Sequence, residues 1–303
     1  MSCVRLPVLS AAAFALTLGC VAYNDPCGGL TQTPEEVVGS LVGQIFLDKA
    51  NARAANNRFG QLAAEAFLDA YADTTAPAQF AFMNGGAIRN EGGTMGPDGE
   101  CLTRNVLGRP ANPGGEGESS DLAVPVTNGD VHQILLFRNQ VYAVDLTEAE
   151  LFEVMEHSVS GLSTETVTSP SGRFLHVAGG TVTVDCALPA GSRVLEIKVG
   201  GRTLQRNGTG MVRVAMPEYL LRGGDGYTVI DAARQLPERN LIQAQRSGGI
   251  DNDIAAAYWK EHYGETPVVS HDAADRAACA SADGAGCQAP IQLRHCAVPP
   301  LPE

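Results

Sequence analysis

The chain has 303 residues, of which 44% are hydrophobic and 18% charged, so it can bury a full core in one large or two modest domains. Its net charge is −13, and it holds only 21 lysine and arginine residues. This balance argues against nucleic acid and anionic lipid surfaces as partners, because it supplies no basic footprint for phosphate groups. An anionic ligand would have to be held by a few local arginines.

Residues 1–20 have the pattern of an export signal. Arg5 precedes a mostly apolar run, 6–21, which is too short and too small in side chain for a comfortable membrane span. Residues 17–20 read Thr-Leu-Gly-Cys and resemble a bacterial lipobox, so we expect an exported protein of the periplasm or cell envelope with a lipid anchor on Cys20. Ordinary cleavage or an uncleaved anchor are the alternatives, because Thr17 stands where leucine is usual. Residues 21–32 would be a linker.

Six cysteines remain once Cys3 leaves with the signal and Cys20 takes the lipid. In an exported chain they predict three disulfides, and the sequence does not choose among the fifteen pairings that six cysteines allow. A metal site built from Cys279, Cys287, His295 and Cys296 is the alternative, although it lacks a Cys-x-x-Cys pair. The six are Cys27, Cys101, Cys186, Cys279, Cys287 and Cys296.

Two helices are predicted in the first quarter of the chain. Thr33-Pro34-Glu35-Glu36 combines an N-cap threonine, a first-turn proline and a glutamate three residues after the cap, so we expect a helix to begin there. Its apolar face would consist of Val37, Val38, Leu41, Val42, Ile45 and Phe46. The second helix is expected from about Phe59 to Tyr71, with an apolar stripe at helical spacing.

The apolar run Gln79–Met83 predicts a buried strand, and Asn84-Gly85-Gly86-Ala87-Ile88-Arg89 follows it. A polar side chain, two glycines and an arginine after a strand predict a sharp turn that presents Asn84 and Arg89 to a ligand. Residues 91–120 are rich in glycine and proline, so an irregular insertion is expected there.

Further elements are predicted between 129 and 303. Helices are expected over 129–135, after the Thr147–Glu150 capping box, and from Asp251 to His262. Gly223-Gly224-Asp225-Gly226-Tyr227 predicts a tight turn. The tail from about 265 to 303 has no apolar period and would be pinned by disulfides. Strands are expected over 140–146, 174–177, 181–186, 194–199 and 211–215, many of them antiparallel.

Three motifs in this order resemble the C-terminal, substrate-binding domain of the 5′-nucleotidase family. They are Asn84–Arg89, the run from Gly129-Asp130-Val131 to Leu136-Phe137-Arg138-Asn139, and Gly223–Tyr227. The likeness extends from about Arg53 to Tyr263, within a domain that we place at 33–264. It implies an α+β fold with a mixed, largely antiparallel sheet and packed helices.

The resemblance also implies a ligand and its site. A nucleotide or nucleoside would hold its base between two aromatic rings, matched here by Phe137 and Tyr227, and such stacking tolerates any base. The implied polar contacts are Asn84 on the base edge, Arg89 and Arg53 toward ribose or phosphate, Asp231 toward a ribose hydroxyl, and the Gly85-Gly86 turn. Taken without the resemblance, the same residues are core aromatics, turn residues and surface ion-pair partners.

The catalytic half of that family is a separate two-metal phosphoesterase domain, which needs Asp-x-His, Gly-Asp-x-x-Asp, Gly-Asn-His and Gly-His-x-His. Only Asp130-Val131-His132 matches one of these, and no Gly-x-Ser-x-Gly elbow occurs. We therefore expect no catalytic residue and no metal cofactor in this chain, and no hydrolysis by the chain alone. A separate metallophosphoesterase would be its partner. The alternatives are a structural or surface-interaction lipoprotein that has lost its ligand, and a hydrolase with unrecognised catalytic residues.

Overall fold

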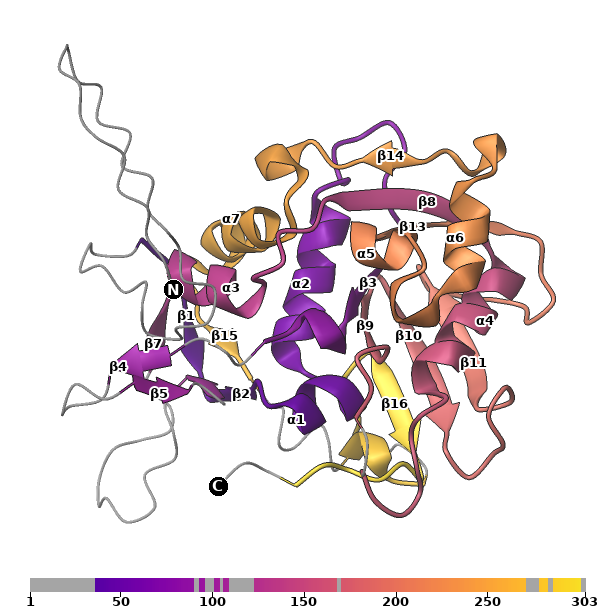
Figure 1. Cartoon of the computed structure of the whole chain (residues 1–303), viewed down its shortest axis with the longest axis horizontal. Coiled ribbons are helices and arrows are strands. Elements are labelled where there is room, and N and C mark those ends of the chain that lie inside the picture. The colour runs from indigo at the N-terminus through magenta and orange to yellow at the C-terminus, as the bar shows by residue number, and fades with distance from the viewer. Residues whose placement is uncertain are drawn as a thin grey trace, which may run out of the picture.

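The computed structural model of this chain describes residues 36–89, 123–167, 170–270, 278–282 and 286–300, with short strands between 93 and 108 (Figure 1). Its centre is a five-stranded sheet in the order β14-β8-β13-β3-β9. β13 pairs parallel with β3, whereas the other neighbours pair antiparallel. The strands are β3 (Phe80–Asn84), β8 (Val141–Thr147), β9 (Leu175–Ala178), β13 (Met211–Pro217) and β14 (Ile242–Gln243).

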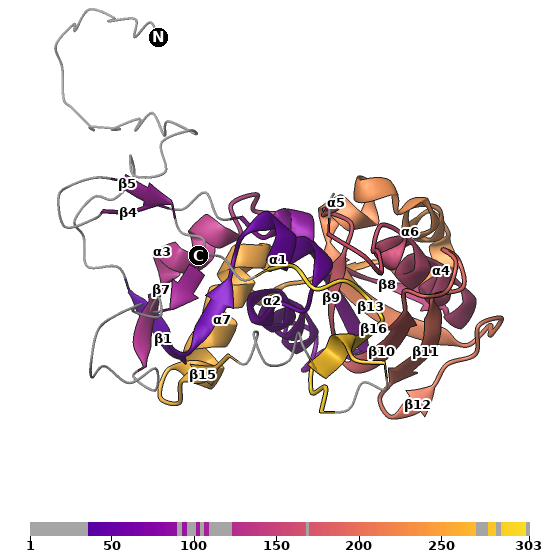
Figure 2. The same cartoon turned by 90° about the horizontal axis from the view of Figure 1, so that it is seen from below.

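The two faces of this sheet contribute to two apolar cores. Along β3, Ala81 and Met83 join one core and Phe80 and Phe82 the other, as the alternation of a strand requires. The first core contains α2 (Arg58–Asp69) and α7 (Asp251–Tyr263), and the second contains α4 (Glu148–Val159) and α6 (Thr228–Arg234). Figure 2 shows α2 and α7 on one side of the sheet strands and α4 and α6 on the other. The result is the α+β fold that the sequence predicted.

A second sheet, in the order β12-β11-β10-β16, packs in the second core. Its last strand pairs parallel with β10 and comes from the tail that was expected to be irregular. The strands are β10 (Gly180–Asp185), β11 (Val194–Val199), β12 (Arg202–Thr203) and β16 (Ile291–Arg294).

The helix predicted to begin at Thr33 is wrong over residues 37–46, and its capping residues Thr33, Pro34 and Glu35 lie outside the described residues. Residues 37–46 form strands β1 (Val37–Val42) and β2 (Gln44–Phe46), with Gly43 at a φ of 87° between them. Three of the apolar residues in 37–42 are β-branched valines, which favour extended backbone, and β1 gains hydrogen-bonded partners in β7 (Val124–Thr127) and β15 (Val268–Val269). These tertiary pairings prevail over the helical spacing.

The other predicted helices and the capping box are confirmed. Thr147 and Glu150 cap each other's backbone at the start of α4, and Thr127 and Asp130 do the same for α3. Three short strands lie in the stretch predicted as irregular: β4 (Gly93–Met95), β5 (Cys101–Thr103) and β6 (Val106–Gly108). The remaining helical elements are α1 (Lys49–Ala54), α3 (Asn128–Ile134), α5 (Glu218–Leu221), η1 (Gly85–Ala87), η2 (Gly224–Gly226), η3 (Pro237–Arg239) and η4 (Arg246–Gly249).

Two disulfides join Cys186 to Cys296 and Cys279 to Cys287. They use all three thiols of the alternative metal site, so that alternative does not hold in this structure. Cys20, Cys27 and the side chain of Cys101 lie outside the described residues. Among the helices that the structure describes, none has the length and apolar character needed to span a bilayer.

Candidate functional site

The Asn84–Arg89 turn is held by its own backbone. The Gly85 N–H donates to the Phe174 carbonyl over 2.7 Å, and the Gly86 N–H donates to the Gly172 carbonyl over 2.9 Å. A Cβ on Gly85 would lie 2.0 Å from the Ala52 carbonyl oxygen, which no side chain tolerates. Glycine is therefore required here because the backbone of α1 approaches so closely.

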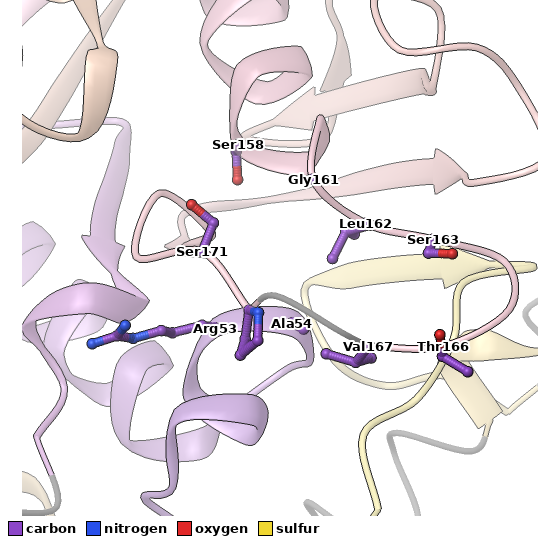
Figure 3. A pocket seen from close by; sticks show the side chains of 10 residues that line it. Arg53, Ala54, Ser158, Gly161, Leu162, Ser163, Thr166, Val167 and Ser171 are labelled. Atoms are coloured by element: carbon purple, nitrogen blue, oxygen red, sulfur yellow. The ribbon is translucent and has the colours of Figure 1, made fainter.

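That close approach brings Arg53, in the last turn of α1, to the turn. The neighbouring Ala52 carbonyl lies 2.9 Å from the His176 ring nitrogen, and burial lowers the pKa of His176 to about 4. Arg53 also borders a hollow of about 320 Å³, solvent-open space included, whose other lining residues are Ala54, Ser158, Gly161, Leu162, Ser163, Thr166, Val167, Pro170 and Ser171. In Figure 3 its guanidinium points away from Ser163 and Thr166, so the charge is not directed into this hollow.

Asn84 belongs to a polar network at the start of the turn. It is 2% exposed, and its Nδ2 donates to the Asp225 carboxylate over 2.9 Å. The Tyr219 hydroxyl donates to the other Asp225 oxygen over 3.1 Å, and the Asp225 N–H donates back to that hydroxyl. Because the carboxylate only accepts, the amide must turn its nitrogen to Asp225, and Asn84 Oδ1 is left buried without a partner in the described part of the chain.

The two tyrosines near this network differ in exposure. Tyr219 is 46% exposed, and partial burial and the Asp225 carboxylate raise its pKa, so it remains a proton donor. Tyr227 is 1% exposed, its hydroxyl donates to the Arg173 carbonyl, and burial raises its pKa well above the ordinary value. Its ring meets His157 edge-on, with 4.8 Å between ring centroids. Tyr227 thus offers no open ring face in this structure.

The other end of the turn carries Arg89, whose guanidinium carbon lies 5.4 Å from the centroid of the Phe137 ring. This is a cation–π distance. Phe137 is 49% exposed and lies in the loop after α3, where Arg138 has a φ of 54°. The structure therefore brings Arg53, Asn84, Gly85, Gly86, Arg89 and Phe137 together along one turn.

Asp231 does not reach this turn through any contact of its carboxylate. It lies on α6 and pairs with Arg234 over 2.6 Å, one helical turn along. Asp225 is the carboxylate that meets Asn84. Asp225 and Tyr219 were not predicted as site residues. Asp225 lies within the glycine motif and Tyr219 is an aromatic residue just after β13, so both positions could have been recognised.

Comparisons with known proteins identify related chains. The sequence profile of the 5′-nucleotidase, C-terminal domain, matches residues 35–232. The trifunctional nucleotide phosphoesterase protein YfkN of Bacillus subtilis is 29% identical over 66% of this chain and 12% of its own length. An apyrase of Aedes aegypti is 27% identical over 74% of this chain and 34% of its own. The chain thus spans a minor part of these relatives.

Solved structures show the same fold. A 5′-nucleotidase precursor from Thermus thermophilus aligns with a TM-score of 0.58 and 22% identity, covering 86% of this chain and 39% of that one. The NAD nucleotidase of Haemophilus influenzae aligns with a TM-score of 0.55 and 14% identity, covering 86% and 38%.

Proposed function

Because this chain belongs to the 5′-nucleotidase C-terminal domain family, we propose that it binds a nucleoside or nucleotide at the Asn84–Arg89 turn. The observation that carries the proposal is the Asn84 side chain, whose Oδ1 is buried and has no hydrogen-bond partner among the residues that the structure describes. An unpaired buried acceptor costs roughly 1–3 kcal/mol, which a donor on a ligand would recover. The amino and imino groups of a base, and the hydroxyls of ribose, are such donors.

Two exposed aromatic rings lie near the two ends of the turn, and we propose that they stack on the base. Phe137 lies at the Arg89 end, and Tyr219 reaches the Asn84 end through Asp225. We give Tyr219 the role that the sequence assigned to Tyr227, because a ring must be open to stack. Tyr227 would support the site indirectly. Its ring packs against His157, and His157 Nε2 lies within hydrogen-bond distance, 2.8 Å, of the Asp225 carbonyl oxygen.

The Asp225 carboxylate would accept a ribose hydroxyl, and Arg89 and Arg53 would face the sugar or phosphate. Hydrolysis would come from a metallophosphoesterase that works with this domain, which places the chain in nucleotide catabolism. The two disulfides fit an oxidising compartment. We further propose that the protein is exported and carries lipid on Cys20.

Calorimetric titration with adenosine and AMP tests the binding site. Phe137→Ala and Tyr219→Ala should each weaken adenosine binding roughly 5- to 100-fold, the equivalent of one base–aromatic stack. Tyr227→Phe is the matched control, since it removes only a buried hydroxyl and should bind adenosine as the wild type does. No saturable binding by the wild type would overturn the proposal. Wild-type affinity in Tyr219→Ala together with a loss in Tyr227→Leu, which lacks the ring, would return the second ring to Tyr227.

Catalysis and anchoring have separate tests. The purified chain should release no phosphate from AMP in the presence of Zn²⁺, Mn²⁺ or Co²⁺, and metal-dependent turnover would contradict the proposed division of labour. Cys20→Ser should move the protein from the membrane fraction to the soluble fraction after expression in a bacterium. An unchanged distribution would contradict lipidation.

A further inference from the structure

The first turn of α7 is hydrogen-bonded to the loop that carries Phe137, residues 135–140. The Asp251 N–H donates to the Asn139 carbonyl over 2.9 Å, and the Asn139 Nδ2 donates to the Asp251 carboxylate over 3.0 Å. Asn252 Nδ2 donates to the Leu135 carbonyl over 3.1 Å. Both α7 residues are 1% exposed, so these bonds are shielded from water.

Three further contacts join the same segment of α7 to this loop and to α3. Gln140 forms an isolated antiparallel bridge with Ile250, the residue before α7. Arg138 and His132 both reach the Asp253 carboxylate, over 3.4 Å and 3.1 Å. Four consecutive residues, 250–253, therefore hold the loop on both sides of Phe137 and hold α3 before it.

The Phe137 ring itself is open to solvent. Phe137 is 49% exposed and Arg138 takes a left-handed backbone, which an arginine adopts at a cost. A ring on an exposed loop serves as a stacking surface only if the backbone beneath it is fixed. The bonds from α7 supply that fixing, and α7 lies beyond residues 35–232 that match the family profile.

We propose that Asp251 and Asn252 are positioning residues that set the Phe137 ring for a stacked base. This proposal rests on the proposed function, because it assumes that Phe137 touches the ligand. Asp251 acts through Asn139, and its carboxylate also accepts the Asn252 N–H over 2.8 Å. Removing this carboxylate deprives the half-buried Asn139 amide and the buried Asn252 N–H of their acceptor, so the loop loses its preferred geometry.

Adenosine titration of the folded full chain tests the role. Asp251→Ala should bind adenosine about tenfold more weakly, the scale of one hydrogen bond to a charged group. Asp251→Asn is the rescue: its amide oxygen accepts the Asn252 N–H, and its nitrogen donates to a flipped Asn139, so affinity should stay within about threefold of the wild type. Asn252→Ala, which frees the Leu135 carbonyl, should behave like Asp251→Ala and serves if that variant does not fold.

Asp145→Ala is the control for a general loss of stability, because this carboxylate on β8 is also buried but binds Arg213 and Asn240 instead of the loop. It should bind adenosine with wild-type affinity. Wild-type affinity in both Asp251→Ala and Asn252→Ala would overturn the positioning role. Equal losses in Asp251→Ala, Asp251→Asn and Asp145→Ala would overturn it as well.

Hydrogen exchange of the backbone amides in residues 135–140 gives a reading without ligand. It should accelerate in Asp251→Ala and not in Asp145→Ala. If the wild type binds no nucleoside, the proposed function fails by itself, and this exchange then decides whether α7 fixes the loop. Unchanged exchange in Asp251→Ala would overturn that fixing.

Discussion

The two ends of the Asn84–Arg89 turn are built differently. At the first end, Asn84 is 2% exposed and donates to Asp225, which also accepts from Tyr219, and the nearby Tyr227 is 1% exposed. At the second end, Arg89 lies against the Phe137 ring, which is 49% exposed. The loop that carries this ring is hydrogen-bonded to α7. The first end thus has fixed hydrogen-bonding geometry, and the second has an exposed ring whose loop depends on contacts with α7. A binding site needs both, because fixed polar groups set orientation and an open ring admits the ligand.

The largest expected effect breaks the fixed end. Gly85→Ala places a methyl group 2.0 Å from the Ala52 carbonyl oxygen, which is backbone and cannot swing away. The turn or α1 must move, so we expect a loss of roughly 3 kcal/mol in unfolding free energy. Urea unfolding measures it. Gly161→Ala is the control, because its added methyl would meet only Ser171 at 3.9 Å. Similar stability in the two variants would show that the turn is not tightly packed.

The next effect separates the two ends by their response to pH. Burial lowers the pKa of His176 from 6.5 to about 4, so the folded protein binds fewer protons at this residue than the unfolded chain does. The stability that neutral His176 contributes is therefore lost as the pH falls from about 6.5 to about 4. Burial raises the pKa of Asp251 from 3.8 to about 6, despite hydrogen bonds from Asn139 that oppose the change. Its contribution is therefore present in acid and lost as the pH rises through about 6.

Substitutions should expose these opposed slopes. His176→Gln should remove the loss of stability in acid, and Asp251→Asn should remove the loss toward neutral pH. Each should change the pH-dependent part of the unfolding free energy by on the order of 2 kcal/mol. Urea unfolding at several pH values between about 4.5 and 7.5 measures both. Parallel pH profiles for the two variants would contradict the assignment.

The smallest effect concerns the open end. Arg89→Gln removes the positive charge and its cation–π contact with Phe137, and such a contact is worth about 0.5–1 kcal/mol at an exposed site. If Arg89 faces the phosphate of a nucleotide, the variant should lose more affinity for AMP than for adenosine. Paired titrations of the two ligands measure the difference, and equal losses would place Arg89 against the nucleoside alone.

Sequence patterns anticipated much of this arrangement where the determinants are local. The strand before Asn84 follows from an apolar run, and α4 follows from the capping pair Thr147 and Glu150. The helix expected at Val37 failed because partners distant in the chain, β7 and β15, decide that segment. Helical spacing alone does not contain that information.

The site shows the same limit. Asn84, Arg89 and Phe137 are recognisable from short motifs. Whether Tyr219 or Tyr227 presents an open face depends on which one packs into the second core, and no local pattern around either residue states that. The hydrogen bond from Asn139 to Asp251 joins residues more than a hundred positions apart, so it too is a property of the folded chain.

The pairing of β16 with β10 has a consequence for biosynthesis. As the chain leaves the ribosome, β10 emerges well before residues 291–294, and until they arrive its outer edge has unpaired backbone groups and Cys186 has no partner. Completion of this sheet therefore follows synthesis of the whole domain. Formation of the Cys186–Cys296 disulfide is therefore also a late step of maturation.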